Sequence, residues 1–135
     1  MKPVHLSMNE FVDVARQVVD KLPEPFLGWL ENVVVDVEIA PTRDMLVDVG
    51  LDPEQETLMG LFVGRAITEQ EYGEHAPNRI LLFKRPIEEA CRSRAEVAYE
   101  IRRTLVHELA HHFGYSEEDL DEYESQQSPF DHEEE

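Results

Sequence analysis

Two histidines four positions apart, His107 and His111, are spaced to bind one metal ion. On an α-helix, residues four apart lie one turn from each other on the same side, roughly 40° apart around the axis. Two neutral imidazoles at this spacing can share one zinc ion without straining the helix. The pattern therefore predicts a Zn²⁺ site, with a pair of simple solvent-exposed histidines as the competing interpretation.

Glu108 follows the first histidine and is expected to lie beside the ion rather than on it. There its carboxylate can take a proton from a zinc-bound water, whose pKa the metal lowers toward about 7. The proton can then pass to a leaving amine, while the metal polarises the substrate carbonyl. This chemistry predicts hydrolysis of a peptide bond with Glu108 as the catalytic residue.

The sequence offers several candidates for the third zinc ligand. Catalytic zinc sites usually have three protein ligands and one open position. Gly114 is suited to ending the helix and turning the chain back, and three residues further lies Glu117. Glu118 and Asp119 are alternatives, because acids are also favoured in the first turn of a following helix. We therefore predict Glu117 and leave open the other two carboxylates, a water molecule or a group of the tail.

The elements that position these residues follow from hydrophobic periodicity and turn residues. We expect helices at residues 8–22 and 94–113, a short helix at 116–125, and strands at residues 33–39, 57–63 and 79–83. Residues 26–31 favour one or two short turns, and residues 42–56 are ambiguous. The chain thus has the element pattern of an α+β domain.

The predicted helix 94–113 has its apolar residues on the side away from the histidine pair. The side chains expected to face the core are Ala95, Ala98, Tyr99, Val106, Leu109 and Phe113. His112 points about 100° away from His111 and is expected to support the site or end the helix rather than bind the metal.

Size and composition indicate one domain, residues 1–125, followed by an acidic flexible tail, residues 126–135. The single cysteine, Cys91, excludes an internal disulfide framework. A net charge of -18 argues against nucleic-acid binding, because such a surface repels phosphates. The lack of a signal sequence or a long apolar run argues against a membrane and makes the cytoplasm the expected location.

Three segments carry a resemblance to a known family: LMGLFVG (58–64), RILLFKRPIEEA (79–90) and HELAHHFGYSEEDL (107–120). With their spacing they resemble the minimal zincin family, small bacterial zinc metallopeptidases. The resemblance implies a small α+β zincin-like domain, with the active-site helix packed against a short mixed β-sheet. It also implies His107 and His111 as zinc ligands and Glu108 as the base. The family typically has Asp where this chain has Glu117.

The resemblance further suggests that a peptide or protein substrate pairs with strand residues Gly60, Leu61, Phe62 and Val63. A plain core strand bounded by glycine turns is the alternative interpretation. For the whole chain, the alternative to a peptidase is a zinc-containing binding or regulatory module with little or no peptidase activity. A fourth ligand from residues 117–124 would favour that alternative.

Overall fold

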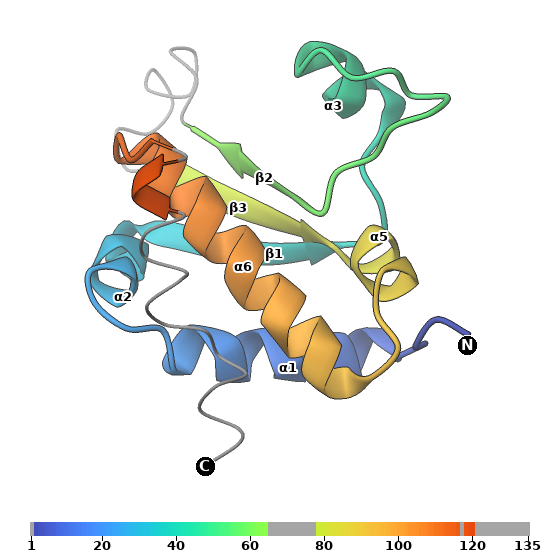
Figure 1. Ribbon diagram of the computed structural model, residues 1–135, viewed down its shortest axis with the longest axis horizontal. Coiled ribbons are helices and arrows are strands. Elements are labelled where there is room, and N and C mark those ends of the chain that lie inside the picture. Colours follow the sequence, from blue (N-terminus) through green and yellow to red (C-terminus); the bar gives the residue numbers. More distant parts are fainter. Residues whose placement is uncertain (1, 65–77, 117, 121–135) are drawn as a thin grey trace, which may run out of the picture.

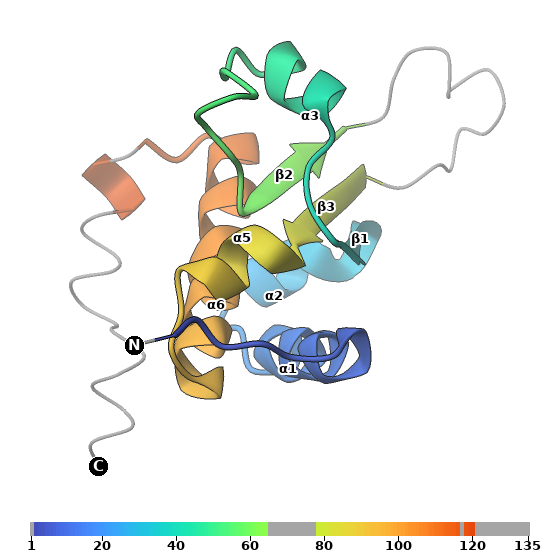
Figure 2. The same ribbon diagram turned by 90° about the vertical axis from the view of Figure 1, so that its right-hand side faces the viewer.

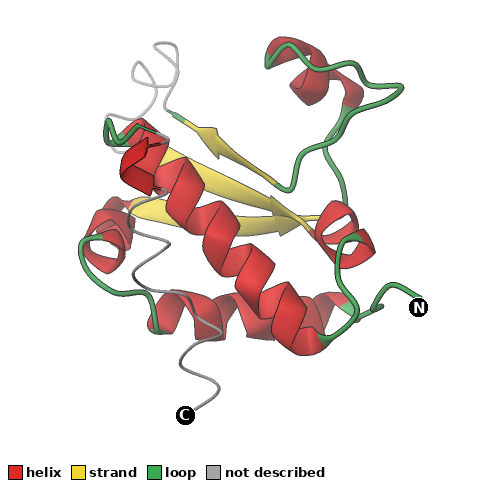
Figure 3. Cartoon of the chain, in the orientation of Figure 1, coloured by secondary structure: helices red, strands yellow, loops and turns green. Residues whose placement is uncertain are grey.

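The computed structural model describes residues 2–64, 78–116 and 118–120, and its centre is a three-stranded mixed sheet (Figure 1, Figure 3). The strands are β1 (Val33–Glu38), β2 (Gly60–Val63) and β3 (Asn78–Phe83). Their order is β1-β3-β2, with β1 parallel and β2 antiparallel to β3. The expected α+β architecture with a short mixed sheet is confirmed, although β2 begins three residues later than predicted.

Besides the helical residues 118–120, five helices and one 3₁₀ turn are defined within the described residues. They are α1 (Met8–Asp20), α2 (Phe26–Trp29), the 3₁₀ turn η1 (Leu30–Asn32), α3 (Arg43–Asp48), α5 (Lys84–Glu89) and α6 (Arg94–His112). Helix α1 begins with the expected capping box, in which Ser7 and Glu10 each accept a hydrogen bond from the other's backbone N–H. It ends two residues earlier than predicted.

Strand β3 lies between the other two strands and forms the centre of the core. Its last four residues, Ile80 to Phe83, are all buried, because one neighbour pairs along each edge and helices pack nearby. A strand covered in this way needs apolar side chains on both faces. The continuous run Ile-Leu-Leu-Phe meets that need, which explains why the strand could be predicted.

Helix α6 contacts α1, α2, α5, β2 and β3, and it crosses the sheet as seen in Figures 1 and 2. Its buried side chains are Val97, Ile101, Leu105, Val106, Leu109 and Ala110. The expected single apolar stripe is therefore partly wrong: Ala95 is exposed and Phe113 is 45% exposed. Packing on several sides buries a wider arc of the helix than one stripe can cover.

Helices α3 and α5 are additions to the expected elements. Thr42 caps α3 by accepting a hydrogen bond from the Met45 N–H. In α5, Pro86 occupies the first turn, where a missing N–H costs nothing. Lys84 and Glu88 form a buried ion pair of 2.9 Å, and the second Glu88 oxygen accepts the Leu6 N–H at 2.6 Å. This pair fixes the N-terminal segment against α5.

Two predictions concern residues outside the described ranges: the acidic tail, 126–135, and most of the short helix expected at 116–125. Residues 118–120 are helical, and Ser116 and Asp119 form the reciprocal hydrogen bonds expected at its start. Across the described ranges, each helix is too short or too polar to cross a bilayer.

Candidate active site

Strand β2 lies directly over one side of α6. Thr104, Glu108 and His112 of α6 are spaced by four residues, so they occupy one stripe of the helix. This stripe faces β2. Thr104 lies under Gly60, and the His112 ring stacks on Phe62 with centroids 4.0 Å apart and planes 16° apart. The helix and the edge strand thus form one unit. His112 is the last residue of α6 and packs on the edge strand. Its support of a metal site stays a prediction.

Gly60 permits this close approach. A Cβ at that position would overlap the Thr104 methyl group, Cγ2, and would lie 3.1 Å from the Leu81 carbonyl oxygen. Any larger residue would therefore push β2 away from α6 or displace the Thr104 side chain. The glycine is a packing requirement and not merely a turn residue.

The outer edge of β2 carries backbone groups that do not pair with β3. The Phe83 N–H donates to the Met59 carbonyl at 2.9 Å, which marks these residues as a hydrogen-bonded pair. Antiparallel pairs alternate, so the pairs Leu61 with Leu81 and Val63 with Arg79 are also of this type. Gly60 and Phe62 consequently direct their backbone groups away from β3. In other proteins, outward backbone groups of an edge strand can pair with an added extended chain.

Glu108 contacts this edge directly. Its Oε1 accepts a hydrogen bond of 2.8 Å from the Phe62 backbone N–H. Burial raises the pKa of the Glu108 carboxyl above its ordinary value, and the Phe62 N–H together with His111 and His107 opposes that rise. The Glu108 carboxylate is therefore half-buried, is fixed in orientation by the Phe62 N–H, and lies at the outer edge of β2.

His107 and His111 lie on the neighbouring stripe of α6, with ring centroids 6.2 Å apart. Two imidazoles on one tetrahedral zinc would have centroids roughly 5 Å apart, a difference that small side-chain rotations can cover. His107 Nδ1 lies 2.9 Å from the Arg103 carbonyl oxygen. Because that oxygen can only accept, Nδ1 carries the proton, so Nε2 is the ring nitrogen that could bind a metal ion. The donor set fits a zinc ion.

A glycine turn follows helix α6. Gly114 has φ +90°, and its N–H donates to His111 O while the Tyr115 N–H donates to Ala110 O. These two bonds form a Schellman motif, which ends α6 and reverses the chain as the sequence predicts. Trp29 holds the turn in place: it stacks on Phe113 at 4.5 Å and meets the Tyr115 ring edge-on at 5.5 Å.

Of the three carboxylates considered as third ligand, Glu117 lies outside the described residues. Glu118 is exposed, and Asp119 Oδ2 accepts the Ser116 N–H at 3.0 Å. That hydrogen bond lowers the pKa of the Asp119 carboxyl and explains this residue as a helix cap. Within the described ranges there is no cluster of three metal-binding side chains. The assignment of Glu117 stays a prediction.

A shallow depression of about 180 Å³, here called the β2–α6 depression, adjoins Glu108. Its other lining residues are Met59, Gly60, Glu100, Arg103, Thr104 and His107. Of the four predicted substrate-strand residues, Gly60 borders this depression, and Leu61, Phe62 and Val63 continue the edge strand away from it. The sequence did not single out Glu100, Thr104 or Trp29, since each reads locally as an ordinary residue of a helix or a short turn.

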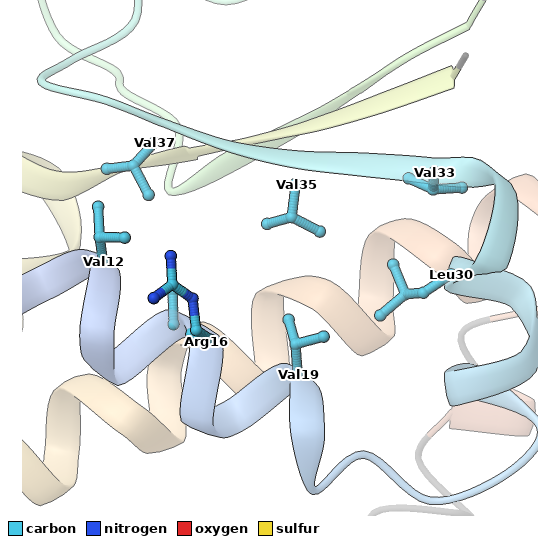
Figure 4. A pocket seen from close by; sticks show the side chains of 8 residues that line it. Val12, Arg16, Val19, Leu30, Val33, Val35 and Val37 are labelled. Atoms are coloured by element: carbon cyan, nitrogen blue, oxygen red, sulfur yellow. The ribbon is translucent and has the colours of Figure 1, made fainter.

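A larger hollow of about 260 Å³ lies between α1 and β1 (Figure 4). Its walls include Val33, Val35 and Val37 of β1 and Val12, Arg16 and Val19 of α1. All but one of these side chains are apolar, and no histidine or carboxylate lines the hollow. It therefore lacks the groups that hydrolysis needs, and the smaller depression is the better candidate.

Comparisons with known proteins show the family and the fold of this chain. A family model described as zincin-like metallopeptidase matches residues 30–127. A search of curated proteins found no match. Among solved structures, a conserved hypothetical protein from Thermus thermophilus is similar, with a TM-score of 0.51 and 21% identity. The match covers 90% of this chain and all of that one, which supports the fold.

Proposed function

Because the chain belongs to the zincin-like metallopeptidase family, we propose that it is a zinc-dependent peptidase with Glu108 as the general base. The supporting observation is the position of the Glu108 carboxylate, which is held by the Phe62 N–H at the outer edge of β2. The two histidines of the adjacent stripe would hold the metal, and Glu117 would complete the site.

The chain's own residues supply positioning and proton transfer. An extended peptide would pair with the outward backbone groups of Gly60 and with the Phe62 carbonyl, because the Phe62 N–H already donates to Glu108. This pairing would bring one of the peptide carbonyls near Glu108. Bound zinc would act as a Lewis acid toward the carbonyl and the attacking water. Glu108 would accept a proton from that water while the water oxygen adds to the carbonyl carbon of the peptide. The same proton would then move to the amine as the C–N bond breaks.

The half-buried environment of Glu108 suits this role. Burial raises its pKa, so the carboxylate is a stronger base than one fully in water. The Phe62 N–H also restricts its rotation. The Arg103 carbonyl orients His107 in the same way, because its hydrogen bond to Nδ1 fixes the tautomer.

A peptide-cleavage assay tests the proposal. Zinc-loaded protein should cleave unstructured peptides, lose this activity with a chelator and recover it with added zinc. Glu108→Gln should retain zinc stoichiometry and lose activity by a factor of about 10² to 10⁴. The matched control is Glu89→Gln, which changes an exposed carboxylate on α5 and should leave cleavage unchanged. Wild-type cleavage rates in Glu108→Gln, or no cleavage by the zinc-loaded protein, would contradict the proposal.

A further inference from the structure

The β2–α6 depression contains a carboxylate, Glu100, that the proposed reaction does not use. Its side chain is only 18% exposed, so water solvates it poorly. Among the described residues it accepts no hydrogen bond, and its one ion pair, with Arg103, is long at 3.8 Å. A largely buried carboxylate gains most from a cationic donor at hydrogen-bond distance.

Arg103 is a weak partner for this carboxylate. Its side chain is 51% exposed, and a long ion pair between such groups contributes little. A half-exposed arginine side chain can rotate away from Glu100 into the solvent with little loss of free energy. A ligand ammonium or guanidinium group could then replace it next to Glu100 and bind at a shorter distance.

The β2–α6 depression lies beside the C-terminal half of a peptide that would pair with β2. Gly60 and Thr104 lie at one end of the β2–α6 contact, and Phe62 and His112 lie at the other. A chain added antiparallel to β2, the more stable pairing, runs from the Val63 end toward the Gly60 end. Its C-terminal half therefore passes beside the depression, while the bond to be cleaved lies near Glu108.

From these observations we propose that Glu100 selects peptides with a lysine or arginine on the C-terminal side of the cleaved bond. The inference rests on the proposed function for the location of that bond. The charge of the whole chain acts in the same direction, because a net charge of -18 attracts cationic peptides and repels acidic ones. Arg103 is the competing cation that the substrate side chain displaces.

Opposite effects of two substitutions provide the test. The probes are labelled peptides that differ at one position on the C-terminal side: lysine, norleucine or glutamate. Their binding to zinc-loaded Glu108→Gln protein is measured by fluorescence anisotropy, and their cleavage by the wild-type protein is followed by mass spectrometry. Lysine should be preferred over norleucine by about tenfold or more in both measurements.

In the same Glu108→Gln background, Glu100→Gln should reduce the lysine preference to about one, whereas Arg103→Gln should increase it. Asp13→Asn, an equal charge change at an exposed site on α1, should leave it unchanged. A glutamate preference that Arg103→Gln removes would overturn the inference, as would equal binding of the three peptides. Lysine-selective binding without any cleavage would sustain the role of Glu100 and contradict the peptidase. Cleavage without a lysine preference would support the peptidase and contradict the role of Glu100.

Discussion

The Glu108 carboxylate accepts the Phe62 backbone N–H at 2.8 Å, and this bond joins helix α6 to the edge strand β2. The two residues are 46 positions apart, so only the tertiary fold brings them together. The bond depends on how closely β2 approaches α6. The predictions below concern the residues that set this approach and the residues around the site.

Gly60→Ala should lower the free energy of unfolding by about 1 to 3 kcal/mol, because the new methyl group overlaps Thr104. It should also reduce peptide cleavage, since β2 must move away from Glu108. Thermal or denaturant unfolding measures the first effect, and kcat/KM measures the second.

The matched double variant is Gly60→Ala with Thr104→Ser, which removes the Cγ2 atom that the new methyl group would overlap. It should recover part of the lost stability, and the coupling energy between the two sites should be favourable. Additive losses in the double variant would show that the glycine serves some purpose other than this contact.

His112→Ala should leave zinc affinity within about twofold of wild type while lowering kcat/KM for peptides by about three- to tenfold. The reason is that His112 stacks on Phe62 and so helps hold the edge strand over Glu108. His112→Phe retains an aromatic ring and should retain most of the activity. Loss of zinc in either variant would instead identify His112 as a metal ligand.

Ionisation of the Cys91 thiol should lower the free energy of unfolding at alkaline pH. Burial raises the pKa of its thiol to about 11 from an ordinary value of 9.0. The unfolded chain loses this proton first, so the free energy of unfolding should fall as pH rises from about 9 to 11, by roughly 2 to 3 kcal/mol.

Because lysines and tyrosines titrate in the same range, the measured quantity is the difference between wild type and Cys91→Ala across that pH window. The difference should be constant below pH 9 and shrink above it. A difference that stays constant up to pH 11 would mean that the thiol ionises equally well in both states.

Local sequence patterns identified the elements that carry the site, because each has a strong period or a clear end. The apolar run in β3, the Ser7 capping box and the Gly114 stop correspond to features of the structure. Helix α5 was not foreseen, since its proline and its charged residues resemble a loop until the fold buries Lys84 and Glu88 as a pair.

Contacts between distant segments could not be predicted in this way. The sequence shows a glycine at position 60 but not the Thr104 methyl group that makes it necessary. Trp29 similarly ends the short helix α2, where its local sequence gives no sign of importance, yet its ring stacks on Phe113 just after helix α6. The prediction of which α6 residues face the core was partly wrong for the same reason. Helix α6 contacts five other elements, which its own sequence does not reveal.

The most direct test of the account is anomalous scattering at the zinc edge from crystals of protein purified without chelators. We predict one zinc ion bound by His107 Nε2, by His111 and by a carboxylate from residues 117–119, with Glu108 nearby but not bound to it. A closed site with four protein ligands would contradict the peptidase and favour a zinc-containing binding module. No zinc at the histidine pair, even after soaking, would contradict the metal site itself.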